Sequence, residues 1–508
     1  MMQSHRYAKT SELKPMKGLA TTTALLCALL ASSAAFAEDL TTTYQKARRN
    51  DPAIRQAEAN MMAILERRPQ ARATLLPQID GTANWNRSDS EGPQTLNFGA
   101  TVLPERFVES DTDTYGWSLN LRQSLFNTDQ WQRLKRSEKE VAQAQADFEA
   151  AQQDLIVRVS EAYFNVLAAQ DTLGAERAAK EAIGRQLEQA NRRFEVGLIA
   201  ITDVKESQAA FDDATATEIA ARRALANAKE ALREITGEYP EVLATAGDEF
   251  PLVPPDPQVE QDWVDVALQQ NALLESARMG TEITRRNIKI ARAGRLPTLD
   301  LTASYGNNVV DGETVFDGGP PNNIDIDTDS LSYGVQFTVP IFSGGGVSAE
   351  INEAVFLHRA ARENYEQVAR QTERDARDAY LGVIAEIARV QALSRSVESN
   401  NVALEATEAG YDVGTRTTVD VLNSRDSLFR AQTLYARSKY DYLINVLRLK
   451  QASGTLDAAD VVELNAWLAR NAEIEVIPGR GGAPDAKLEE TTVPSNPGGE
   501  APGQNPAR

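Results

Sequence analysis

The sequence is poor in the residues that most often carry catalysis or covalent cross-links. Its 508 residues include one cysteine, Cys27, and two histidines, of which only His358 lies beyond the first forty positions. A single cysteine cannot form an internal disulfide, and so few histidines leave little general-base or metal-ligand chemistry. No P-loop and no dinucleotide-binding fingerprint is present. We therefore expect no enzymatic activity, no cofactor and no metal site, and we expect His358 to be a helix surface residue.

Long apolar runs are equally scarce, and the one near the N-terminus has the features of an export signal. Four basic residues precede an apolar run over about 19–30, and Ala35-Phe36-Ala37 then fits the small-x-small rule for signal-peptide cleavage. We expect residues 1–37 to be removed, so that the mature chain begins at Glu38. No later stretch reaches 18 consecutive apolar residues. If the mature chain enters a membrane, it must do so as strands closed into a β-barrel.

Positive charge is in deficit, since the formal net charge of the chain is −20. A surface of this sign favours neither nucleic acid nor anionic lipid. We therefore expect no nucleic-acid partner.

One long unit occurs twice in the chain. Phe194–Val204 reads F-E-V-G-L-I-A-I-T-D-V, and Tyr411–Val421, which lies 217 positions later, reads Y-D-V-G-T-R-T-T-V-D-V. Each copy places a glycine, Gly197 or Gly414, in the middle of a long helical pattern. Glycine tolerates the positive φ with which helices commonly end. We expect two helical hairpins that bend at these two glycines.

The repeat divides the chain into domains. The expected division is a signal peptide (1–37), repeat 1 (38–237), a proline-rich linker (238–260), repeat 2 (261–454), a short helix (455–472) and a disordered Pro/Gly-rich tail (473–508).

Each repeat also contains two segments that alternate with period two. Aromatic and aliphatic side chains occupy one face, and small polar groups occupy the other, which is the pattern of a strand. The expected strands cover about 78–88, 114–123, 298–306 and 331–340, and the polar segments 88–113 and 307–329 are expected to be loops.

Such strands fit the wall of a transmembrane barrel, with lipid on one side and water on the other. Four strands cannot close a barrel, so several chains would have to pool their strands. Eight strands enclose a space that side chains fill, so a conduit favours three or more chains. A soluble β-sandwich layer and a plain soluble coiled coil are the alternatives at this point.

Several motifs resemble those of the TolC family of outer-membrane efflux channels. They are N-D-P after the first helix, L-L-P-Q before the first strand, A-Y-F-N-V-L at 162–167, R-F-E-V-G-L-I-A-I-T-D-V at 193–204, L-P-T-L-D-L-T-A-S at 296–304 and Y-D-V-G-T-R-T-T-V-D-V-L at 411–422. The resemblance runs from about Glu38 to Ala472.

The resemblance implies a mainly α-helical fold with a β-barrel, built from two tandem structural repeats. A homotrimer would share one 12-stranded transmembrane barrel in the outer membrane, and antiparallel helical hairpins would form a long periplasmic α-barrel. The chain would be a passive conduit for efflux or type I secretion. A periplasmic adaptor and an inner-membrane pump or ABC transporter would open it at its periplasmic tip.

The resemblance also implies a gate at that tip. Tyr411 and Arg416 of the second hairpin would bond to Asp203 of the first, beside Thr202. These residue types suit the role, because a phenol and a guanidinium both donate hydrogen bonds to a carboxylate.

A pore ring is implied by a pair of aspartates three residues apart in the family. The first matches Asp420, but the second position is Asn423 here. A trimer would then present one ring of three carboxylates. The alternative for Asp420 is a charge that stabilises the N-terminus of a helix.

Two other classes of protein compete with the channel interpretation. A periplasmic adaptor or structural coiled-coil protein would also have helical hairpins, but adaptors lack two pairs of aromatic alternating strands. A hydrolase would need convergent catalytic residues, which this sequence does not provide.

Overall fold

The computed structural model describes residues 38–95, 97–98, 101–102, 105–240, 243–244, 252–466 and 468. The expected signal peptide and the expected tail lie outside the described residues. In chain order the elements are α2 (Leu40–Asn50), α3 (Pro52–Leu65), α4 (Arg67–Ala73), β1 (Gln78–Gln94), β2 (Asn97–Phe98), β3 (Thr101–Val102), β4 (Arg106–Phe126), α5 (Thr128–Glu195), α6 (Ile201–Thr236), α7 (Glu260–Gln270), α8 (Ala272–Ala293), β5 (Thr298–Phe316), β6 (Asn322–Thr338), α9 (Gly346–Asp412), α10 (Thr418–Ser453) and α11 (Ala458–Asn465).

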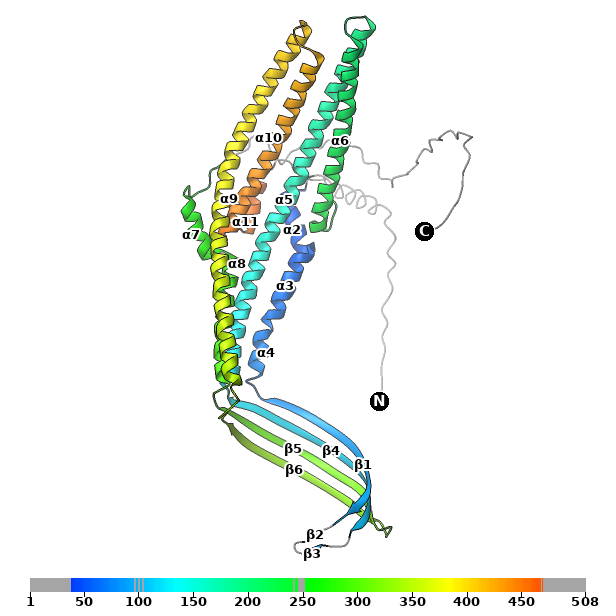
Figure 1. Ribbon diagram of the computed structural model, residues 1–508, viewed down its shortest axis with the longest axis vertical. Helices are drawn as coiled ribbons and strands as arrows, with labels where there is room; N and C mark the ends of the chain where they lie inside the picture. The colour runs from blue at the N-terminus through cyan, green and yellow to red at the C-terminus, as the bar shows by residue number, and fades with distance from the viewer. Residues whose placement is uncertain are drawn as a thin grey trace, which may run out of the picture. The chain divides into compact units, whose positions relative to one another are not determined.

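The elements fall into two similar series (Figure 1). Each series has short helices, then a long antiparallel strand pair, then a long helix that returns as a shorter one. The two long helices, α5 and α9, have 68 and 67 residues, and both return arms have 36. At 1.5 Å per residue each long helix extends about 100 Å. The chain is thus mainly helical, as expected.

The four long strands form one antiparallel sheet in the order β1-β4-β5-β6. They are 17 to 21 residues long, so the prediction of loops over 88–113 and 307–329 is wrong for most of both segments. In these segments the main-chain pairing continues, but charged residues replace apolar ones on the same face of the sheet. Asp89 lies opposite Asp111, and Asp311 lies opposite Asp325. The hydrophobic alternation therefore stops before the main-chain pairing does.

The two faces of the sheet differ in chemistry. One face carries large apolar side chains, including Trp117, Tyr305 and Tyr333, and the rings of Trp117 and Tyr305 meet edge to face at 5.5 Å. On the other face, the hydroxyl oxygens of Thr82 and Ser118 lie 2.9 Å apart in a hydrogen bond. Residues directly opposite in an antiparallel pair share a face, so the register keeps these two sets apart.

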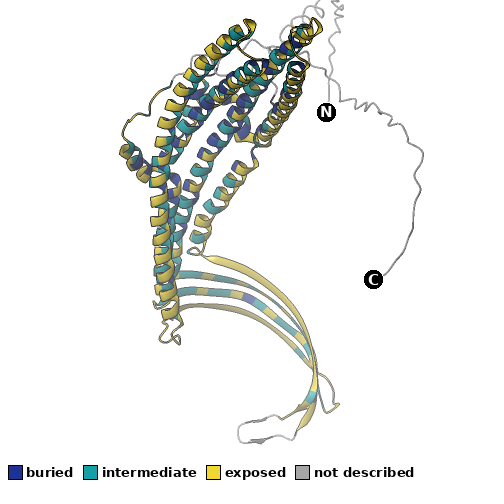
Figure 2. Ribbon diagram, turned by 45° about the horizontal axis from the view of Figure 1, so that its top comes forward, coloured by how far each residue is buried: buried dark blue, intermediate teal, exposed yellow. Residues whose placement is uncertain are grey.

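The core lies among the helices, and the sheet is mostly exposed or half-buried, as Figure 2 shows. Tyr163 and Phe164 of α5 and Leu443 and Leu447 of α10 are almost fully buried in one cluster. That cluster also includes residues of α2, α6, α9 and α11, so the two repeats share a single core. Among the described residues, no helix has both the length and the hydropathy required to cross a bilayer.

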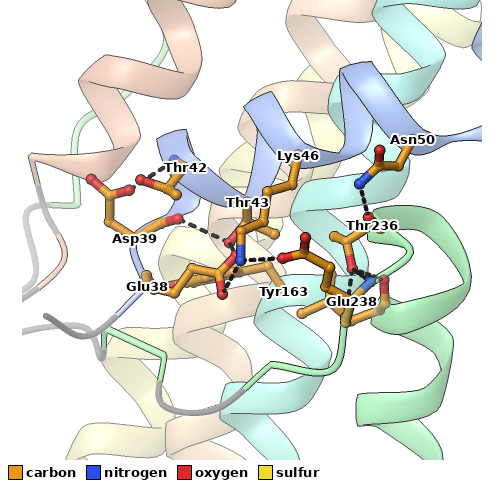
Figure 3. Close-up of polar contacts among 10 residues, drawn as sticks. Glu38, Asp39, Thr42, Thr43, Lys46, Asn50, Tyr163, Thr236 and Glu238 are labelled. Carbon is orange, nitrogen blue, oxygen red and sulfur yellow. Dashed lines mark hydrogen bonds and ion pairs between the residues drawn. The ribbon is translucent and has the colours of Figure 1, made fainter. Parts of the chain in front are cut away.

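Tyr163 fastens the start of the described chain to this core (Figure 3). Its hydroxyl donates to the carbonyl oxygens of Ala244 at 2.7 Å and Glu38 at 3.2 Å. The amide of Ala244 donates to the same Glu38 carbonyl at 3.0 Å. Lys46 forms ion pairs with Glu38 and with Glu238 just after α6. Burial raises the pKa of Tyr163, so the phenol remains a neutral donor.

The repeat supplies a matched test of this anchor. Tyr380 is the counterpart of Tyr163, but its hydroxyl bonds to the carbonyl of Gln258 at an exposed position. We expect Tyr163→Phe to lower the free energy of unfolding by about 1–3 kcal/mol, because the buried carbonyl of Ala244 loses its donor. Tyr380→Phe should change it by less, because water replaces the lost bond. Denaturant unfolding followed by helical circular dichroism measures both, and equal effects would contradict the anchor.

Candidate gate at the hairpin tips

The structure places the two helical bends at Gly197 and Gly414. Their φ angles are 77° and 81°, in the left-handed region that residues other than glycine adopt only at an energetic cost. The amide of Leu198 donates back to the Arg193 carbonyl at 2.9 Å, and that of Thr415 donates to the Gly410 carbonyl at 2.8 Å. These bonds satisfy carbonyls that the helix ends would leave unpaired. The gate residues therefore lie beside sharp, well-bonded turns.

Tyr411 lies one residue before the end of α9 and is held by the first hairpin. The guanidinium of Arg193, on α5, lies 4.9 Å from the centre of the Tyr411 ring. Arg193 also forms an ion pair with Asp412 at 3.4 Å. A guanidinium over an aromatic face is an attractive cation–π contact. Arg193 thus joins the tips of the two hairpins, a role that the sequence did not reveal.

A second cross-hairpin contact lies further from the bend, at Arg425 of α10. Its guanidinium donates to Glu408 of α9 at 2.6 and 3.1 Å and to the carbonyl of Ala182 on α5 at 2.8 Å. The Arg425 side chain is only 18% exposed, so water screens these charge-assisted bonds weakly. One side chain therefore holds both arms of the second hairpin against the first. The only sequence signal was a pair of opposite charges on either side of Gly414.

The predicted acceptor is not joined to the predicted donors within one chain. Asp203 lies half-buried in the first turn of α6, and Thr202 beside it is exposed. Arg416 is exposed in the turn between α9 and α10. In the described part of the chain, no hydrogen bond or ion pair connects Asp203 with Tyr411 or Arg416. The gate contact between these residues therefore stays a prediction about the assembled protein.

Asp420 caps the helix that it begins. Its carboxylate accepts from the amide of Thr417 at 2.8 Å and from the Thr417 hydroxyl at 3.0 Å. The amide of Asp420 donates back to that hydroxyl at 3.2 Å, which completes a capping box. The bonds from the Thr417 amide and hydroxyl, helped by nearby Arg416, hold the pKa of Asp420 below its ordinary value. A cap and a pore ring are compatible, because the side chain is still half-exposed.

The fold, with two tandem units that each have paired strands and a long helical hairpin, is that of solved outer-membrane channels. The chain superposes on the Campylobacter jejuni CmeC outer membrane channel with a TM-score of 0.66 at 19% identity, over 85% of this chain and 90% of that one. On CusC the TM-score is 0.68 at 18% identity, over 82% and 93% of the two chains. These likenesses establish the fold.

Sequence comparison then gives the family. The chain is 40% identical over 441 residues to outer membrane protein TolC of Vibrio cholerae, covering 86% of this chain and 95% of that protein. It is 33% identical over 437 residues to the alkaline protease secretion protein AprF of Pseudomonas aeruginosa, covering 85% and 88%. Residues 43–238 and 263–455 match the family of outer membrane efflux proteins, and the chain belongs to that family.

The expected resemblance is thereby confirmed. The chain is an outer-membrane exit channel, and its family is one of transport channels, not enzymes. The comparisons do not favour a periplasmic adaptor or a structural coiled-coil protein.

A pair of variants separates the two roles of Asp420. We expect Asp420→Asn to lower the permeability ratio of cations to anions in planar bilayers, because a ring of carboxylates attracts cations. Thr417→Ala removes the cap and keeps the carboxylate, so selectivity at neutral pH should persist.

The pH dependence has a definite sign. Wild-type selectivity should persist as the pH falls to about 4, the ordinary aspartate range, and decline only below it, because the pKa of Asp420 is lowered. In Thr417→Ala the decline should begin at slightly higher pH, because the hydroxyl bond that favours the charged form is lost while the bond from the backbone amide remains. Unchanged selectivity in Asp420→Asn would show that this residue is only a helix cap.

Proposed function

We propose that three copies of this chain form a gated, passive conduit from the periplasm across the outer membrane, serving efflux and type I secretion. The observation that carries this proposal is the sheet with two open edges. In the described residues β1 pairs only with β4, and β6 pairs only with β5. Each outer strand therefore presents 17 residues of backbone with one side unpaired.

Open edges of this length require a partner. Unpaired N–H and C=O groups cost several kcal/mol each in lipid, and exposed edges in water invite aggregation. Joining β6 of one copy to β1 of the next would satisfy both edges. Three copies would close a 12-stranded barrel wide enough to conduct, whereas two would give an eight-stranded barrel filled by side chains.

The two faces of the sheet support a membrane wall. We assign the face with Trp117 and Tyr333 to lipid and the face with Ser118 and Gly334 to the lumen. Tyr333 is 82% exposed in the single chain, which is unfavourable for an aromatic side chain unless lipid or protein covers it. Hydroxyl and amide groups on the other face would line a water-filled passage.

Charge substitution tests which face meets lipid. We expect Trp117→Arg to destabilise the folded barrel by about 2–4 kcal/mol if it lies near the bilayer midplane, because a charge in lipid is poorly solvated. Ser118→Arg, one position further on the opposite face, should cost much less. The comparison requires folding titrations in lipid vesicles, and equal tolerance at both positions would contradict the assignment.

The hairpins would form the periplasmic part and its gate. Arg416 has no ion-pair partner within the described part of its own chain. We propose that in the closed trimer Arg416 and Tyr411 donate hydrogen bonds to Asp203 of a neighbouring protomer, beside Thr202. The contacts of Arg193 and Arg425 keep the two hairpins of one chain together, so the movable contact is the one between chains.

Single-channel conductance tests this gate. We expect Tyr411→Phe with Arg416→Ser to raise the conductance in planar bilayers, because the closed tip loses its donors. Arg430→Ser is a matched control, since Arg430 is exposed and pairs only with Asp426 within its own helix. A double variant that conducts like the wild type would refute the gate assignment, and a rise in the control would show a nonspecific charge effect.

An adaptor and an inner-membrane pump or ABC transporter would act at the same tips. Val196, Leu198 and Val413 are between 71% and 75% exposed at the bends. Apolar residues so exposed indicate a contact surface for another protein. We propose that a periplasmic adaptor covers them. A photoreactive residue at position 198 should crosslink to the adaptor in cells, and capture of channel subunits alone would contradict this contact.

A further inference from the structure

Positive charge is concentrated where the helices meet the strands, although the whole chain carries a net charge of −20. Residues 66–77, 127–137 and 285–297 are three segments that we call the basic band. They contain eleven cationic side chains and two acidic ones, Glu66 and Asp129. The cations are Arg67, Arg68, Arg72, Arg133, Lys135, Arg136, Arg285, Arg286, Lys289, Arg292 and Arg295.

The band lies next to the expected membrane wall along the chain. α4 ends four residues before β1 begins, and α8 ends four residues before β5 begins. Between β4 and α5 there is only Asn127, followed within four residues by Trp131, which is 51% exposed. Tryptophan is enriched where membrane and water meet. In the proposed barrel, the band would therefore lie at the level of lipid headgroups.

Within the band, α4 and α5 enclose a groove of about 480 Å³ that three arginines line. Arg67 and Arg136 share one carboxylate, Glu140, at 3.4 and 3.0 Å. Arg133 also lines the groove, and its own partner, Asp129, lies one turn back on α5 at 2.6 Å. The lining thus contains three guanidinium groups and one carboxylate, which leaves an excess of positive charge.

Other cations around the groove lack internal partners. Arg68, Arg72 and Lys135 are exposed, and none forms an ion pair in the described part of the chain. Two polar contacts hold the second repeat beside the groove: Arg136 donates to Asn287 at 3.4 Å, and Arg286 donates to Gln132 at 3.5 Å. The band is therefore continuous from α4 through α5 to α8.

We propose that the basic band binds the phosphate groups of anionic phospholipids in the periplasmic leaflet of the outer membrane. The groove of Arg67, Arg133 and Arg136 is the main site. Guanidinium groups match phosphate through paired hydrogen-bond donors, and basic residues at a membrane surface attract anionic lipid. This inference rests on the proposed barrel, and it differs from the expectation, drawn from net charge alone, that anionic lipid is not favoured.

Lipid binding to the purified full-length assembly in non-ionic detergent tests the proposal. Phosphatidylglycerol is the anionic probe, phosphatidylcholine the zwitterionic one, and inorganic phosphate the competitor. The variant is Arg67→Gln with Arg133→Gln and Arg136→Gln. The control is Arg185→Gln with Arg370→Gln and Arg430→Gln, three exposed arginines that pair within their own helices. A variant with lysine at the three groove positions keeps the positive charge, so it distinguishes loss of charge from a general effect of substitution on folding.

The expected result is preferential binding of phosphatidylglycerol that the groove glutamines weaken on the order of 100-fold. The control should change little, and the lysine variant should retain most of the binding. Equal affinity for both lipids, or unchanged binding in the glutamine variant, would overturn the proposal. Displacement by equimolar inorganic phosphate would show a free-phosphate site instead. Bilayer conductance of the same preparations reports channel assembly separately, so lost lipid binding and lost function are distinguishable.

Discussion

Main-chain hydrogen bonding at the two edges of the sheet is the constraint on which the rest of the structure depends. A single chain makes four long strands but cannot pair β1 or β6 on their outer sides. In the proposed assembly, neighbouring chains satisfy these edges by standing side by side around an axis. The strands run into the helices after one to seven residues, so the helices of those chains would also become neighbours. The open edges would thus determine both a barrel and a helical conduit.

Charge would then set the position of the membrane along the proposed assembly. Beyond the apolar stretch, the far halves of the strands carry like charges opposite each other, as at Asp113 and Asp311. Such pairs are unfavourable unless water surrounds them or a nearby cation compensates their charge. Arg87, for example, forms an ion pair with Asp111. At the other end the arginines of the basic band follow the strands. The apolar stretch of the sheet is therefore flanked by acidic residues at one end of the strands and by basic residues at the other.

Contacts within a chain and contacts between chains have different tasks at the tips. Arg193 and Arg425 bind the second hairpin to the first through an aromatic face, one carboxylate and a backbone carbonyl. Arg416 and Asp203 have no such partners within the described chain. In the proposed trimer, opening would therefore separate protomers at the tip while each hairpin pair stays intact.

Sequence patterns predicted the features that depend on local physical chemistry. Glycines at 197 and 414 marked the bends because only a residue without a Cβ adopts positive φ freely, and helix-forming composition marked the long helices. The strands were predicted too short, since their polar halves pair through backbone that no side-chain pattern reports. Arg193 was missed because its partners Tyr411 and Asp412 lie on the other hairpin, and Arg425 because its partner on the other hairpin is a backbone carbonyl. For Asp420 the sequence offered the alternative of a charge at a helix N-terminus, but not its capping box with Thr417, although the two residues stand at capping-box spacing.

The number of chains in the purified particle tests the central claim most directly. Native mass spectrometry of the protein extracted from outer membranes in non-ionic detergent should show a complex of three identical chains that survives mild activation. A stable particle of one chain would contradict the account, because the edges of β1 and β6 would then have no partners. A stable pair of chains would contradict it as well, because eight strands enclose no open passage.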